Sequence, residues 1–120
     1  MIFDFDQFAD ITSRVFPRGL YSLNEALFVF RCYFEAYEEH TGRPHPPIKA
    51  SQIVSIVQDM PYLAIEDFGA YSATVRPMDY PAIIKRHFRT KYRRCDWNIN
   101  HFFSGRIREM RFLELCRMDD

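Results

Sequence analysis

The chain has few of the residues that glycine-loop enzymes and disulfide-bonded proteins need. Its 120 residues include only 4 glycines and 3 cysteines, and no Cys-x-x-Cys pair occurs. So few glycines leave no loop that cradles a nucleotide phosphate, and three widely spaced cysteines do not make a disulfide framework. The longest apolar run, ALFVF, is too short to cross a membrane, and the start, MIFDFDQF, lacks the basic and apolar regions of a signal peptide. We therefore expect a cytoplasmic protein without a small-molecule cofactor.

The chain also lacks net charge, but its charges are unevenly distributed. Residues 1–80 carry 6 Lys or Arg and 11 Asp or Glu, whereas residues 81–120 carry 10 and 5. The two parts therefore have net charges of −5 and +5. An imbalance of this kind indicates an anionic partner for the basic part, or association of the chain with itself.

Aromatic residues, by contrast, are abundant. The chain contains 12 Phe and 7 Tyr, and aromatic residues make up 17% of it. A disordered chain would lack these residues, so we expect a dense aromatic core or a core with an exposed apolar face. The length is that of one domain, which places residues 1–120 in a single folded unit.

Apolar residues recur at helical spacing over most of the chain. The clearest segment begins with SLNE at Ser22–Glu25, a capping box in which each side chain bonds the other residue's backbone amide. Its polar strip is narrow, so this helix should lie in the middle of the bundle. We also expect N-caps at Asp4, Ser51 and Asp79. Together the patterns predict a mainly α, compact bundle of four to five helices at about 5–15, 22–41, 50–60, 79–90 and 98–116, with one short β element near 70–76.

The last predicted helix contains a glycine. Apolar residues from Ile99 to Leu113 keep one helical phase through Gly105, which favours a single helix weakened there by about 1 kcal/mol relative to alanine. The alternative is a break at Ser104-Gly105, with Gly105 as the C-cap.

The basic C-terminal part is the leading candidate for a binding surface. In the helix at 79–90, His87 and Phe88 belong to the apolar stripe and should be buried. Basic side chains on the opposite side, in the following connection and along one side of the last helix suit phosphate contacts and stacking on bases. The predicted nucleic-acid-binding residues are Lys85, Arg86, Arg89, Lys91, Arg93, Arg94, His101, Arg108 and Arg111. This pattern predicts a small non-catalytic protein that binds nucleic acid, DNA in the first place.

Two other functions fit the same residues. The arginine-rich face also suits a protein–protein interaction module, such as an accessory subunit or an inhibitor, with an acidic partner or a second copy. In the segment RCDWNINH, Arg94 and His101 resemble the R-x4-6-H motif of the HEPN ribonucleases. That resemblance implies metal-independent RNA cleavage, with the histidine as general acid or base and the arginine stabilising the charge on the phosphorus.

No metal site is predicted. Glu38, Glu39 and His40 are adjacent, so they fan around a helix instead of sharing one side as metal ligands do, and His45 lies beyond a glycine stop. Cys95 has cationic neighbours that favour a thiolate, but the sequence places no partner base beside it. The connection at about 90–97 is too long for a standard helix-turn-helix, which leaves only a winged variant with GAYSATVRP as its wing.

Overall fold

The chain folds into α-helices around a core of aromatic rings in the computed structural model. The structure describes residues 3–17, 21–60, 64–68, 71–103 and 107–118, with the backbone alone for the two strands and residue 118. The described elements are α1 (Phe5–Val15), α2 (Leu23–Thr41), α3 (Ala50–Asp59), β1 (Ala64–Phe68), β2 (Tyr71–Thr74), α4 (Tyr80–Arg89), α5 (Ile99–Phe103) and α6 (Ile107–Met118). The predicted mainly α, compact bundle is confirmed.

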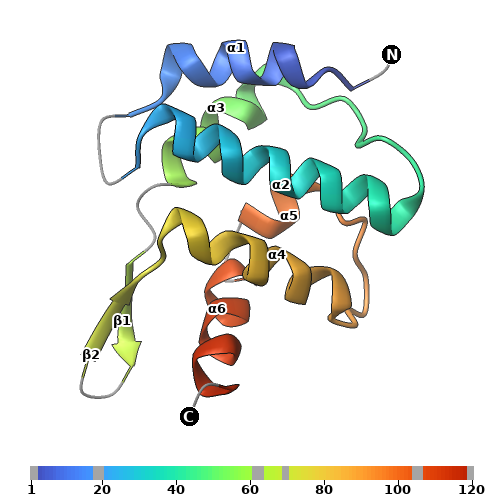
Figure 1. Ribbon diagram of the computed structural model, residues 1–120. Helices are drawn as coiled ribbons and strands as arrows, with labels where there is room; N and C mark the ends of the chain where they lie inside the picture. The colour runs from blue at the N-terminus through green and yellow to red at the C-terminus, as the bar shows by residue number, and fades with distance from the viewer. Residues whose placement is uncertain (1–2, 18–20, 61–63, 69–70, 104–106, 119–120) are drawn as a thin grey trace.

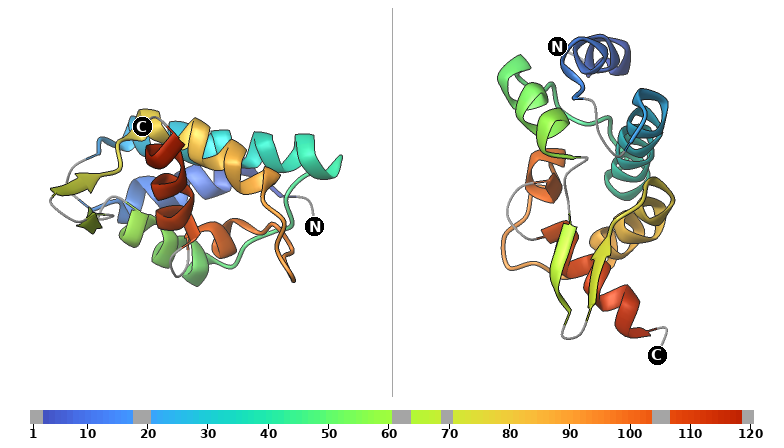
Figure 2. Two further views of the ribbon diagram at one scale, coloured as in Figure 1. Left: turned by 90° about the horizontal axis from the view of Figure 1, so that it is seen from below. Right: turned by 90° about the vertical axis from the view of Figure 1, so that its left-hand side faces the viewer.

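The helices are arranged in two layers (Figures 1 and 2). Helices α2 and α4 lie side by side in one layer, α3 and α5 lie in the other, and α1 contacts both α2 and α3. Helix α6 packs against α4 and α5. As expected from its narrow polar strip, α2 lies in the middle, where Phe30 and Tyr33 are completely buried. The rings of Phe8, Tyr80 and Phe102 complete this core.

The ends of α2 follow the sequence closely. Ser22 and Glu25 form the predicted capping box, with Ser22 Oγ 3.1 Å from the Glu25 amide nitrogen and Glu25 Oε1 2.8 Å from the Ser22 amide nitrogen. Gly42 ends the helix with a φ of 74°, a left-handed conformation that glycine adopts without steric cost. Local chemistry thus sets the bounds of the central helix.

The β element near 70–76 proves to be one arm of a hairpin. Strand β2 pairs antiparallel with β1, and the hairpin extends away from the helices (Figure 1). After it, Asp79 accepts a hydrogen bond from the Arg76 amide at 2.8 Å and closes the short 3-10 helix Pro77–Asp79. Asp79 is the N-cap residue of α4, as expected, but its side chain makes no capping bond to that helix, because its carboxylate accepts from the preceding turn. The expected cap at Ser51 is wrong, because the N-cap residue of α3 is Lys49, two residues earlier, and the helix has no side-chain cap.

The predicted single helix at 98–116 is also wrong. The structure has two helices there, α5 and α6, and the Ser104-Gly105 position lies outside the described residues. The buried face changes between them. Ile99 and Phe102 of α5 are completely buried, whereas Met110 of α6 is 40% exposed.

Arg108 is buried on α6, although the apolar pattern predicted that it would lie on the exposed side of the helix. The residue is 6% exposed and its guanidinium group donates to the carbonyl oxygens of Met60, at 3.0 Å, and Asp59, at 3.2 Å. These carbonyls end α3, where the helix dipole is negative. Arg108 also donates to the Tyr80 hydroxyl at 3.0 Å and lies over the Phe103 ring. One side chain therefore joins α6 to α3, α4 and α5.

Replacement of Arg108 should destabilise the fold. Arg108→Met leaves two carbonyls and a hydroxyl without their donor, which should lower the free energy of unfolding by about 2–4 kcal/mol. Urea unfolding followed by circular dichroism measures the change. Arg117→Met, an exposed arginine on the same helix, is the matched control and should change it by less than about 0.5 kcal/mol. Equal losses for the two variants would contradict the structural role of Arg108.

Candidate nucleic-acid interface

The nine basic residues predicted to form one surface occupy three different environments. Lys91, Arg93 and Arg94 are exposed in the connection between α4 and α5, and we call these three residues the basic loop. Lys85 and Arg89 are exposed on α4. The others have partners inside the protein: Arg86 with Glu114, His101 with Cys95, and Arg108 and Arg111 in the interior.

The expectation that Arg108 and Arg111 face outward is wrong. Each is only 6% exposed, because aromatic rings cover their side chains and oxygen atoms accept from their guanidinium groups. A hydrophobicity pattern places every arginine on the polar side of a helix. It does not register that a long apolar stem and a planar guanidinium group suit a buried site when acceptors are present.

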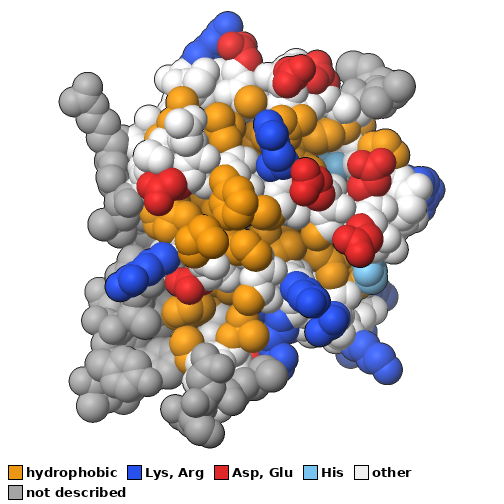
Figure 3. All heavy atoms as spheres, viewed as in Figure 1, with side chains coloured by type: hydrophobic (Ala, Val, Ile, Leu, Met, Phe, Trp, Pro, Cys, Tyr) orange, Lys and Arg blue, Asp and Glu red, His pale blue; other side chains and the backbone are white. Residues whose placement is uncertain are grey.

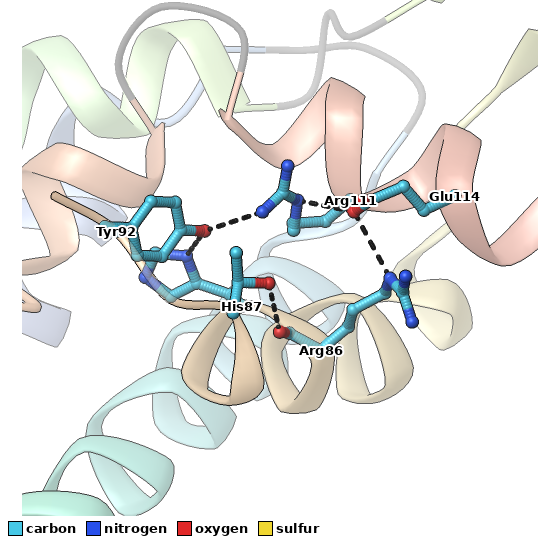
Figure 4. Close-up of polar contacts among 6 residues, drawn as sticks. Arg86, His87, Tyr92, Arg111 and Glu114 are labelled. Atoms are coloured by element: carbon cyan, nitrogen blue, oxygen red, sulfur yellow. Dashed lines mark hydrogen bonds and ion pairs between the residues drawn. The ribbon is translucent and has the colours of Figure 1, made fainter.

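A chain of polar contacts between buried and half-buried side chains holds the basic loop in place (Figure 4). Tyr92, between two cations of the loop, points inward, and its hydroxyl lies 2.7 Å from His87 Nδ1. Arg111 donates to the same hydroxyl at 3.3 Å, and its Nε lies 2.7 Å from Glu114 Oε1. Arg86 contacts that same carboxylate oxygen at 3.2 Å. This chain joins α4, the basic loop and α6.

The contacts of His87 determine its tautomer. The Tyr33 hydroxyl donates to the Trp97 carbonyl oxygen at 2.6 Å, so its oxygen is left to accept from His87 Nε2 at 3.3 Å. Nδ1 then carries no proton and accepts from the Tyr92 hydroxyl. Burial, together with the nearby His101, Arg111 and His40, lowers the pKa of His87 to about 3. The imidazole is therefore neutral at physiological pH.

The cations of the basic loop are available to a ligand. In the part of the chain that the structure describes, Lys91, Arg93 and Arg94 make no ion pair. With Tyr92 fixed inward, its neighbours on both sides turn toward solvent. The same connection contains Trp97, which has a left-handed φ of 62°, unusual for a residue other than glycine, and whose ring stacks on Phe88.

Beside the basic loop lies a polar hollow of about 630 Å³. Its lining includes the amide side chains of Gln52, Asn98 and Asn100, together with Arg94 and His101. Gln52 comes from α3, Asn100 and His101 from α5, and Asn98 from the residue before α5. Amide and guanidinium groups bind the edges of nucleic-acid bases and phosphate oxygens. Sequence analysis missed this hollow, because Gln52 is separated from the other lining residues by a long stretch of chain.

Cys95 and His101 form a pair within the hollow. The Cys95 sulfur lies 3.2 Å from His101 Nδ1, and the Trp97 backbone N–H donates to the same sulfur at 3.3 Å. Burial raises the pKa of the Cys95 thiol, Asp96 adds to this, and the Trp97 N–H opposes it. The thiolate that its basic neighbours suggested is therefore not favoured. The structure does place a histidine beside the thiol, which the sequence did not show.

His40 and His45, for which no metal site was predicted, make contacts that stabilise the fold. His45 is buried, and its Nε2 accepts from the Ile99 amide at 2.9 Å while Nδ1 donates to the Pro46 carbonyl at 2.7 Å. It thus caps the start of α5. His40 packs edge-on against Trp97. Within the described residues, no group of three or more His, Cys, Asp or Glu side chains is placed to hold a metal ion.

The chain matches no protein-family model, no curated protein and no solved structure. In the described ranges, no helix has both the length and the apolar character needed to cross a bilayer.

The buried neutral His87 should make the fold sensitive to acid. In the unfolded chain the pKa of His87 is about 6.5. Between that pH and about 3, His87 is therefore protonated in the unfolded state but not in the folded state. Stability therefore falls as the pH falls from about 6.5 to 3, by up to about 1.4 kcal/mol per pH unit from this group. His45, whose pKa is also lowered by burial, acts in the same direction.

The measurement is urea unfolding at several pH values. His87→Gln should be less stable than the natural protein at pH 7 but should lose less stability between about pH 6.5 and 4.5. Gln58→Ala, which alters an exposed and uncharged side chain on α3, should leave the slope unchanged. An unchanged slope in His87→Gln would show that His87 is not the buried neutral group.

Proposed function

We propose that this protein binds nucleic acid, DNA in the first place, through the basic loop and the adjacent polar hollow, and that it acts by binding without catalysis. The observation that carries the proposal is the juxtaposition of three exposed, unpaired cations with a hollow lined by three amide side chains. The three free cysteines also favour a location inside the cell, in a reducing compartment.

The two parts of this surface have different roles. Cations of the basic loop neutralise phosphates and release condensed counterions, which provides affinity that depends on salt but not on sequence. The hollow supplies amide groups of the kind that form paired hydrogen bonds with base edges. The amide side chains of the hollow can reach the edges of an unpaired base, whereas base pairing hides part of those edges in a duplex, so we expect single-stranded DNA to bind more tightly than duplex DNA.

The proposal is tested with a triple variant of the basic loop. Lys91→Gln, Arg93→Gln and Arg94→Gln together should weaken binding to mixed-sequence single-stranded DNA and reduce the slope of log affinity against log salt by about 2. Fluorescence anisotropy with labelled DNA and RNA at several salt concentrations provides both numbers. Gln52→Ala should weaken binding by up to about tenfold without changing the slope, because an amide contact releases no counterion.

A matched control removes the same charge elsewhere. Arg14→Gln, Arg31→Gln and Arg117→Gln alter three exposed arginines outside the basic loop and should leave the slope as it is. An equal fall of the slope in both triple variants would show that only net charge matters. Lack of binding to any of the nucleic acids at low salt would overturn the proposal.

One structural observation favours each of the two alternative functions, the protein–protein interaction module and the ribonuclease. The α2–α4 face holds a groove with an apolar floor, which favours a protein partner. Arg94 and His101 line the same hollow, as the ribonuclease hypothesis requires. Incubation of labelled RNA with the protein and EDTA tests the ribonuclease hypothesis. Our proposal predicts that the RNA stays intact. Cleavage that is lost in His101→Ala would instead show that the protein is a metal-independent ribonuclease.

A further inference from the structure

A groove of about 690 Å³ runs between α2 and α4 on the face opposite α3 and α5. Its floor consists of apolar side chains, Cys32 and Ala36 from α2 and Ile84 and Phe88 from α4. Phe28, 42% exposed, stands one turn before Cys32 on the same side of α2 and extends this apolar strip. Figure 3 shows hydrophobic side chains gathered along the line between the two helices.

The two edges of the groove carry opposite charge. Glu35 and Glu39, one turn apart, form the α2 edge, and Lys85 and Arg89, one turn apart, form the α4 edge. All four side chains are exposed. Among the residues that the structure describes, none of the four makes an ion pair, so the groove is not closed by contacts across it.

This arrangement is complementary to itself. When two copies meet face to face, a two-fold axis along the groove brings the α2 edge of each copy opposite the α4 edge of the other. Each glutamate pair then faces a lysine and an arginine, while the apolar floors meet between them. A two-fold axis across the groove would instead place glutamate opposite glutamate, which electrostatic repulsion disfavours. The charges thus select one of the two symmetric arrangements.

We propose that the α2–α4 groove is a dimer interface and that its occupant is a second copy of this chain, related by a two-fold axis parallel to the groove. A different protein would need two acidic and two basic groups in the reverse order beside an apolar strip. The chain itself presents that pattern. The basic loop lies outside the groove, so this inference does not depend on nucleic-acid binding, and a dimer would carry two copies of that loop.

The test uses two double variants with reversed charges. Glu35→Lys with Glu39→Lys makes both edges basic, and Lys85→Glu with Arg89→Glu makes both edges acidic. In sedimentation-velocity runs over about 1–200 µM, the natural protein should dimerise as its concentration rises. Each double variant alone should remain monomeric, because like charges then face each other, and an equimolar mixture of the two should form a heterodimer.

A matched control and a folding check complete the experiment. Lys91→Glu with Arg93→Glu reverses the same number of charges outside the groove and should leave dimerisation unchanged. All six residues replaced in these variants are exposed, so the circular-dichroism spectra of the variants should match that of the natural protein. A natural protein that stays monomeric over the whole range would overturn the proposal. Double variants that dimerise as well as the natural protein would overturn it too.

Discussion

The inward position of Tyr92 is the constraint on which the candidate surface depends. Its hydroxyl is shared by His87 and Arg111, and Arg111 is in turn paired with Glu114. These groups are buried or half-buried, and a polar group without a partner in such a place costs about 1–3 kcal/mol. The contacts must therefore form together. Once they do, the cations on both sides of Tyr92 are directed outward.

The same chain of contacts relates the interior to both proposed surfaces. Arg86 shares the Glu114 carboxylate with Arg111, so the α4 residues that border the α2–α4 groove and the loop that follows α4 are fixed by one network. Two copies joined along the groove would present two basic loops to one nucleic acid. Linked sites gain affinity without any new contact, provided that both reach the same strand.

Most of the fold could be predicted from the sequence, because local signals set its helices. The capping box at Ser22–Glu25, the glycine stop at Gly42 and the proline after Asp79 locate α2 and α4 to within about a residue of the predicted bounds. The burial of His87 also followed from helical spacing. Each of these signals lies within a few residues of the feature that it determines.

The predictions were wrong where the position of a side chain depends on residues that are distant in the sequence. Arg108 is buried because the end of α3 needs donors, and nothing near Arg108 in the sequence reports that need. The polar hollow likewise joins Gln52 to residues of α5. One local signal was available for the basic loop: Tyr92 is an aromatic residue between cations, and an aromatic ring packs inward more readily than a lysine or arginine side chain.

The central claim is that the arginines divide into an interior set and a working set. Footprinting with an arginine-specific dicarbonyl reagent, read by peptide mass spectrometry with and without single-stranded DNA, tests it most directly. The account predicts rapid modification of Arg93 and Arg94, protection of both by DNA, and modification of Arg108 and Arg111 only after unfolding. Modification of Arg108 and Arg111 at the rate of Arg93 in the folded protein would contradict it.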